Sequence, residues 1–354
     1  MTPELGIIEG RFGRPWSWTE RVTTMRTLAS AGYSFYHYGA KADAHLRRCW
    51  HEPHPPIEQA AITAFAHACR EAHVRFGIAL TPIGSTHPFD DETRAQLSAR
   101  IATLDAIGLD DLVILFDDLR GDLPKLARAQ ADIVHFCADR TNASRIFFCP
   151  TYYSTDPVLD RVFGQRPAGY LQDLGRFLDP AVRVYWTGEE VCSREVGPSH
   201  LRRVAAEIGR PVCLWDNYPV NDGARMSRFL HLRAFTGRPP AIAAEIVAHA
   251  INPAIQAVLT CIPALTLPAA YRAGDDYAYG AAFAAAACQV MGDELAAMLG
   301  ADIPALQDIG LERLGDRSRD LRQRYAAFDH PGAREIVRWL DGEDLMTDEV
   351  VRTQ

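Results

Sequence analysis

The sequence has little lysine and a deficit of positive charge. Only Lys41 and Lys125 are lysines among 37 basic residues, and 45 acidic residues leave a formal net charge of −8. A basic stripe that would bind nucleic acid is therefore not expected. The chain also lacks an apolar run of about 18 residues and a basic, apolar leader. We predict a cytoplasmic protein that contacts neither nucleic acid nor membrane.

Motifs for metal and cofactor chemistry are also missing. The eight cysteines contain no Cys-x-x-Cys pair, so we predict reduced, mostly buried thiols rather than disulfides or zinc ligands. His45, His51 and His54 lie among prolines that break any helix able to align them, so we interpret them as ordinary loop histidines. No Gly-x-Gly-x-x-Gly, Gly-x-Ser-x-Gly or His-Glu-x-x-His is present. No metal or cofactor is expected.

What the chain does have is a regular alternation of apolar runs and amphipathic segments. The runs are 6–9, 34–38, 76–81, 112–116, 145–149, 182–186, 212–215 and 245–250. Their spacing of roughly 30 to 40 residues is that of a strand–helix unit. Runs that are apolar throughout are typical of parallel strands covered on both faces. We predict a TIM (β/α)8 barrel over residues 1–260, with an open doubly wound sheet as the competing fold. Residues 261–354 are predicted to form a helical extension packed on the barrel.

The most informative polar residues follow the apolar runs, where a TIM barrel has its active site. The run 112–116 leads directly into Asp117 and Asp118. Two adjacent acids in a poorly solvated site should differ in pKa, a division that suits glycosidic cleavage. Because neighbouring strand residues face opposite ways, the chain must turn at Asp118 for both to face a ligand. Alternatively, Asp118 caps a turn, or the pair holds magnesium with Asp122.

Other residues at the strand ends have two interpretations each. Lys41 follows the second run and is either a ligand contact or a solvated loop lysine; a Schiff-base role would need a lowered pKa. Tyr153 and Trp215 are either core aromatics or the apolar wall of a sugar site. Neither choice is decided by the residues alone.

Taken together, these segments resemble glycoside hydrolase family 84, which contains the O-GlcNAcases and bacterial β-N-acetylglucosaminidases. The likeness covers roughly residues 5 to 260 in the family's order. It is carried by Glu9-Gly10-Arg11-Phe12-Gly13-Arg14-Pro15-Trp16, Tyr38-Gly39-Ala40-Lys41, Leu115-Phe116-Asp117-Asp118, Cys149-Pro150-Thr151-Tyr152-Tyr153, Trp186-Thr187-Gly188, Trp215-Asp216-Asn217 with Asp222, and Asn252-Pro253. Several motifs in one order are more specific than any single motif.

The resemblance implies a retaining exo-β-N-acetylglucosaminidase without a protein nucleophile. In that family the 2-acetamido oxygen of the substrate attacks the anomeric carbon and forms an oxazoline. Asp117 matches the aspartate that accepts the acetamide N–H, and Asp118 matches the general acid and base. The remaining matches are Tyr153, Trp215 and Asn217 in the acetamide pocket, and Gly10, Lys41, Asp222 and Asn252 as contacts to the sugar hydroxyls. The expected partner is a small-molecule or glycoconjugate substrate bearing β-linked N-acetylglucosamine.

The chain departs from the family pattern at two positions. Arg11 and Phe12 stand where the family usually has Phe-Tyr, and Ala42 stands where an aspartate is common. A guanidinium near the mouth would pair with an anionic group of the substrate. We therefore hypothesise that Arg11 binds a carboxylate of the substrate, or that Glu9 or another acid anchors it.

Two other functions remain as alternatives. One is a barrel lyase or aldolase that uses Lys41 or a divalent ion bound by Asp117. The other is a non-catalytic protein that binds N-acetylhexosamine and turns nothing over.

Overall fold

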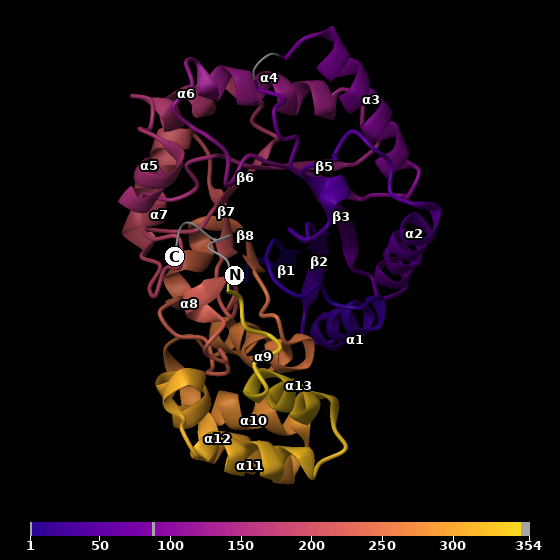
Figure 1. The fold of residues 1–354 in the computed structure, drawn as a ribbon. Coiled ribbons are helices and arrows are strands. Elements are labelled where there is room, and N and C mark those ends of the chain that lie inside the picture. Colours follow the sequence, from indigo (N-terminus) through magenta and orange to yellow (C-terminus); the bar gives the residue numbers. More distant parts are fainter. Residues whose placement is uncertain (1, 87–88, 348–354) are drawn as a thin grey trace.

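The chain folds into a closed barrel of eight parallel strands, seen in a computed structural model that describes residues 2–86 and 89–347 (Figure 1). Each strand pairs with the next along the chain, and the last pairs with the first. The strands are β1 (Glu4–Glu9), β2 (Tyr33–Tyr38), β3 (Arg75–Leu80), β4 (Asp111–Leu115), β5 (Arg145–Cys149), β6 (Arg183–Trp186), β7 (Val212–Asp216) and β8 (Ile246–Ile251). All eight overlap the predicted apolar runs, so the predicted TIM barrel is confirmed.

Helices surround the strands (Figure 1). They are α1 (Trp18–Ala29), α2 (Pro56–Glu71), α3 (Asp91–Asp105), α4 (Leu126–Ala138), α5 (Pro157–Phe163), α6 (Tyr170–Phe177), α7 (Pro198–Ile208), α8 (Gly223–Met226) and α9 (Ala257–Ala273). Residue 260, the expected end of the barrel domain, lies within α9. This helix packs against both α1 and α10 (Tyr279–Met291), so it joins the barrel to the C-terminal helices.

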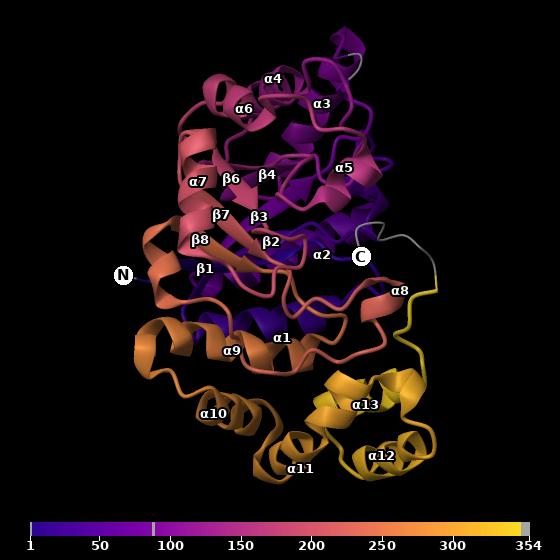
Figure 2. The same ribbon diagram turned by 90° about the vertical axis from the view of Figure 1, so that its left-hand side faces the viewer.

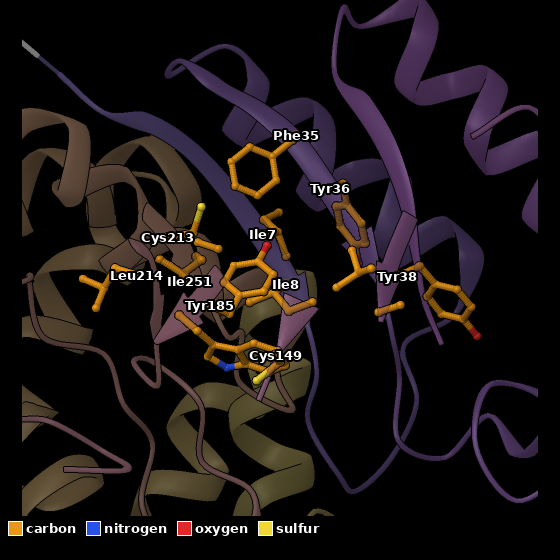
Figure 3. Close-up of a cluster of buried hydrophobic side chains, with 14 of the residues drawn as sticks. Ile7, Ile8, Phe35, Tyr36, Tyr38, Cys149, Tyr185, Cys213, Leu214 and Ile251 are labelled. Atoms are coloured by element: carbon orange, nitrogen blue, oxygen red, sulfur yellow. The ribbon is translucent and has the colours of Figure 1, made fainter. Parts of the chain in front are cut away.

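Local sequence signals explain where elements begin and what they bury. Ser17 and Glu20 form a capping box at the start of α1: the Ser17 hydroxyl accepts from the Glu20 N–H, and the Glu20 carboxylate accepts from the Ser17 N–H. The strands place Ile7, Tyr185 and Ile251 in one buried cluster (Figure 3). Continuous apolar runs therefore supply both the barrel interior and the layer beneath the helices.

A buried ion network closes the barrel at the end where the strands begin. Asp111, at the start of β4, accepts hydrogen bonds from Arg75 and from Arg145. It also contacts Nε2 of His37 at 3.1 Å, and His37 Nδ1 lies 2.7 Å from the Tyr185 hydroxyl. Hydrogen bonds to Asp111 hold its pKa well below the usual range although burial opposes this. Sequence analysis assigned no role to this network.

The C-terminal helices form a layer beside the barrel (Figure 2). After α10 come α11 (Asp293–Ile303), α12 (Arg317–Ala326) and α13 (Pro331–Leu340). Glu335 of α13 accepts hydrogen bonds from the N–H groups of Val258 and Leu259 at the start of α9, and the Trp339 indole donates to the Ser227 carbonyl. Helix was predicted through Gln354, but residues 348–354 lie outside the described part. No helix in the described part is long and apolar enough to span a membrane.

Candidate active site

A cavity opens at the carboxyl ends of the strands and collects most of the predicted site residues. It is lined by Gly10, Phe12, Asp117, Asp118, Cys149, Tyr153, Thr187, Val191, Cys192, Trp215, Asn217, Val220, Asp222 and Asn252. Eight of the ten predicted site residues are among them. The other two, Lys41 and Arg11, are not lining residues. The strand-end placement follows from the parallel barrel, in which all carboxyl ends meet at one face.

Asp117 and Asp118 both face this cavity because the chain turns where β4 ends. Asp118 has φ of 61°, a left-handed conformation that is uncommon for residues other than glycine. That turn brings two consecutive side chains to one side. The alternative magnesium site with Asp122 is not formed, since the Asp122 carboxylate is exposed and paired with Arg120.

Lys41 lies behind the two acids. Its ammonium group, 1% exposed, is bonded to Oδ2 of Asp117 and lies 3.7 Å from Oδ2 of Asp118. The other oxygen of Asp117, Oδ1, is buried and has no hydrogen-bond partner in the described chain. A buried acceptor without a donor is costly, so this oxygen is prepared to accept an N–H or O–H from a ligand.

Asp118 is set up to hold a proton. Burial raises its pKa above the ordinary value, and the negative charge of Asp117 raises it further. The positive charges of Lys41 and Arg47 act in the opposite direction. The pair therefore consists of one acid bonded to an ammonium group and one whose pKa is raised, a difference that suits a stabilising carboxylate and a general acid.

One wall of the cavity is the indole of Trp215, which hydrogen-bonded side-chain amides hold in position. Trp215 Nε1 donates to Oδ1 of Asn217 at 3.0 Å, and the same oxygen accepts from Nδ2 of Asn252 at 3.0 Å. Asn252 Oδ1 in turn accepts the Gly10 N–H at 3.2 Å. These residues lie at the carboxyl ends of β7, β8 and β1. Their hydrogen bonds therefore connect the ends of these neighbouring strands.

Asp222 and Tyr153 complete the lining among the predicted residues. Asp222 is 5% exposed, and its Oδ2 accepts the Phe12 N–H at 2.8 Å. Tyr153 is buried beside Phe163, with its ring centroid 6.4 Å away. Both side chains thus border the cavity and contact neighbouring residues, Asp222 through the backbone of Phe12 and Tyr153 through the ring of Phe163.

Arg11 is buried and is not among the lining residues of the cavity. It is 3% exposed, and its Nη1 donates to the carbonyls of Phe12 and Arg14 at 3.1 and 2.8 Å. Glu9 is bonded instead by Arg21 and by the Tyr36 hydroxyl. Backbone carbonyls thus bind Nη1 of Arg11, while its buried Nε and Nη2 have no hydrogen-bond partner among the described residues. A role of Arg11 in binding a carboxylate of the substrate stays a hypothesis.

Several lining residues were not chosen from the sequence. Phe12, Cys149 and Thr187 occurred in the quoted motifs without a role, while Val191, Cys192 and Val220 lie in loops. Loop residues of this kind carry no periodic signal, because their direction depends on contacts with distant parts of the chain.

The described residues contain no group of three or more His, Cys, Asp and Glu side chains placed to hold a metal ion. Of the three loop histidines, His54 Nε2 contacts Asp43 at 2.9 Å, and its ring lies 5.3 Å from that of His45. His51 is exposed. These side chains form a local polar cluster rather than a metal centre.

Comparison with known proteins agrees with this geometry. A family model described as beta-N-acetylglucosaminidase matches residues 5–301. The chain belongs to this family, glycoside hydrolase family 84. The resemblance found from the sequence motifs is thereby confirmed.

Two named relatives are similar in sequence to part of this chain. The protein O-GlcNAcases of Mus musculus and Rattus norvegicus are each 29% identical over 237 residues, which cover 64% of this chain and 25% of theirs. The chain thus matches about a quarter of the length of these relatives. A solved mutant of the O-GlcNAc hydrolase of Thermobaculum terrenum has the same fold, with a TM-score of 0.79 at 24% identity over 95% of this chain and 80% of that one.

Proposed function

We propose that this β-N-acetylglucosaminidase family member removes terminal β-linked N-acetylglucosamine with retention, using the acetamide of the substrate as the nucleophile. The observation that carries the proposal is the buried Oδ1 of Asp117, an acceptor without a donor at a cavity lined by Trp215, Tyr153 and Asn217. An acetamide offers the N–H that this oxygen needs and the methyl group that suits an aromatic wall.

In the proposed first step the acetamide N–H donates to Asp117 and the acetamide oxygen attacks the anomeric carbon. The bond from that carbon to the leaving oxygen breaks, and Asp118 gives its proton to that oxygen. An oxazolinium forms, and Asp117 stabilises its positive charge. Water then attacks the same carbon, the bond from that carbon to the acetamide oxygen breaks to restore the acetamide, and Asp118 takes a proton from the water, so two inversions give net retention.

The other lining residues would hold the sugar. Gly10, Asp222 and Asn252 are proposed to contact its hydroxyl groups. Lys41 is proposed to hold the Asp117 carboxylate in position through their ion pair and to contact a hydroxyl of the sugar. The aglycone, whether an O-GlcNAc-modified protein, an anionic group or a simple glycoside, is left to experiment.

The test compares two aryl glycosides that differ only at carbon 2. Release of the aryl group from the β-N-acetylglucosaminide but not from the β-glucoside supports the proposal, and equal hydrolysis of both refutes it. Asp117→Asn should lower the rate on the N-acetyl substrate. Sugar binding without product would instead indicate a non-catalytic protein, and borohydride trapping on Lys41 or loss of activity with a chelator would indicate a lyase.

A further inference from the structure

One wall of the cavity is a loop that depends on distant contacts for its position. The segment after β6 contributes Val191 and Cys192 to the lining and contains no helix or strand up to α7. The Val191 carbonyl accepts from Nδ2 of Asn217 at 2.7 Å.

The next part of this loop is held by Arg238. Its Nη2 donates to the Ser193 carbonyl at 2.9 Å, and its Nη1 donates to the Arg194 carbonyl at 2.6 Å. The same guanidinium binds both oxygens of Asp216, at 2.7 Å from Nε and 2.5 Å from Nη2. Asp216 directly follows Trp215 and precedes Asn217. One planar group therefore bonds the end of β7 and the loop at once.

The backbone around Arg238 supports this connection. The Val196 N–H donates to the Gly237 carbonyl at 2.9 Å. Gly237 has φ of +69°, and a Cβ atom on it would stand 2.3 Å from the Arg194 carbonyl oxygen. Besides its bonds to Arg238, the Asp216 carboxylate contacts Nε2 of His249 at 2.9 Å. The ion pair is buried, with side-chain exposures of 6% for Arg238 and 2% for Asp216.

We infer that Arg238 is a positioning residue that sets the width of the N-acyl pocket, and so limits the size of the N-acyl group that the enzyme accepts. This rests on the proposed function, which places the acetamide beside Trp215 and Asn217. Trp215 and Asn217 belong to the strand end that Arg238 holds, and Val191 and Cys192 belong to the loop that it holds. The distance between these two walls is thus set by the Arg238 guanidinium together with the hydrogen bond from Asn217 to the Val191 carbonyl.

The consequence is a specific loss of discrimination. When the guanidinium fork is removed, the loop keeps its hydrogen bond from Asn217 to Val191 but loses its attachment at Ser193 and Arg194, so the cavity can widen and admit a longer acyl chain. Apolar pockets distinguish one methylene by about 10- to 200-fold in kcat/KM. A wider pocket should therefore distinguish acyl groups by a smaller factor in kcat/KM. Asp117 and Asp118 stay unchanged.

The experiment measures the ratio of kcat/KM for an aryl N-acetyl and an aryl N-butyryl β-glucosaminide. The ratio is independent of how much of each preparation is folded, so a purely structural defect does not change it. Arg238→Lys keeps the charge but loses the fork. Gly237→Ala keeps the ion pair, but its added methyl group should displace the loop at the Arg194 carbonyl. Each should lower the ratio by about tenfold.

Arg233→Met is the matched control. Arg233 lies on the same segment and pairs with Asp308, and within the described residues its side chain has no hydrogen bond or ion pair to the loop. The ratio of kcat/KM for the two substrates should be the same in Arg233→Met and in the unchanged chain. An unchanged ratio in both Arg238→Lys and Gly237→Ala would overturn the inference. Absence of N-acetyl hydrolysis by the unchanged chain would refute the proposed function instead.

Discussion

Gly10 lies directly against the indole of Trp215, so that a Cβ atom on Gly10 would stand 2.3 Å from Cζ2 of that ring. The end of β1 therefore needs a glycine because the aromatic wall of the cavity occupies the space of a side chain. The relationship connects the first and seventh strands, which are far apart in the chain.

Replacing this glycine should damage the site more than the fold. Gly10→Ala must push the Trp215 ring into the cavity, and we expect kcat/KM on an aryl β-N-acetylglucosaminide to fall by about 10²-fold. Gly280→Ala is the control, since no heavy atom lies within 4 Å of a Cβ built there. Full activity of Gly10→Ala would show that the ring position does not matter for turnover.

The general-acid role of Asp118 predicts a dependence on the leaving group. Asp118→Asn should lower the rate by about 10²- to 10⁴-fold for a poorly activated aglycone and much less for a strongly activated aryl group. Asp122→Asn, which changes an exposed carboxylate on the same loop, should affect neither substrate. A slope of rate against leaving-group pKa that is the same in Asp118→Asn and the unchanged chain would contradict the assignment.

The charges around Asp118 predict a shift in the pH profile. Cleavage needs protonated Asp118, so kcat/KM should fall as the pH rises through its pKa, which burial and Asp117 raise and Lys41 and Arg47 lower. Arg47→Gln removes a cation that favours the ionised form, and the basic limb should move to higher pH. Arg48→Gln, an exposed neighbour, should leave it in place. A shift to lower pH would mean that another group titrates.

The burial of Arg11 predicts that it does not recognise anionic substrates. Arg11→Phe removes hydrogen bonds to the carbonyls of Phe12 and Arg14, and we expect a loss of stability of about 1–3 kcal/mol. The ratio of kcat/KM on a carboxylated and a neutral aryl glycoside should stay constant. A selective loss on the carboxylated substrate would restore the first hypothesis for this residue.

The C-terminal helices predict a pH effect on stability. Burial raises the pKa of Glu335 to about 7. Because the folded pKa exceeds the unfolded value, the stability that this proton provides is complete below about pH 4.5 and is lost as the pH rises through 7. Glu335→Gln keeps an acceptor for the N–H groups of α9 without the charge, so its unfolding free energy should fall less over this range, by up to about 3 kcal/mol.

Glu343→Gln is the control for that titration, because it changes an exposed acid near the same helix. Chemical denaturation at pH 5, 6, 7 and 8 measures the difference. Parallel curves for Glu335→Gln and the unchanged chain would show that Glu335 does not titrate in this range.

The residues that end strands could be predicted, and those in loops could not. Asp117, Trp215 and Asn252 directly follow or end apolar runs, and a parallel barrel brings such positions to one face whatever the rest of the sequence is. Arg11 is only two residues beyond β1, but it is not among the lining residues of the cavity. The carbonyls of Phe12 and Arg14 bind it, and no local pattern indicates that choice.

The sequence by itself determined the barrel, its family and the strand-end residues of the cavity, because burial on both faces of a parallel strand imposes an apolar run that is visible in the chain. Tertiary structure alone decided that Lys41 lies behind the two acids, that Arg11 faces the backbone, and that Val191 and Cys192 form a wall. These placements depend on contacts between residues distant in the chain, such as those of Arg238 with Ser193 and Asp216. Such contacts leave no periodic pattern in the local sequence, so the sequence alone does not predict them.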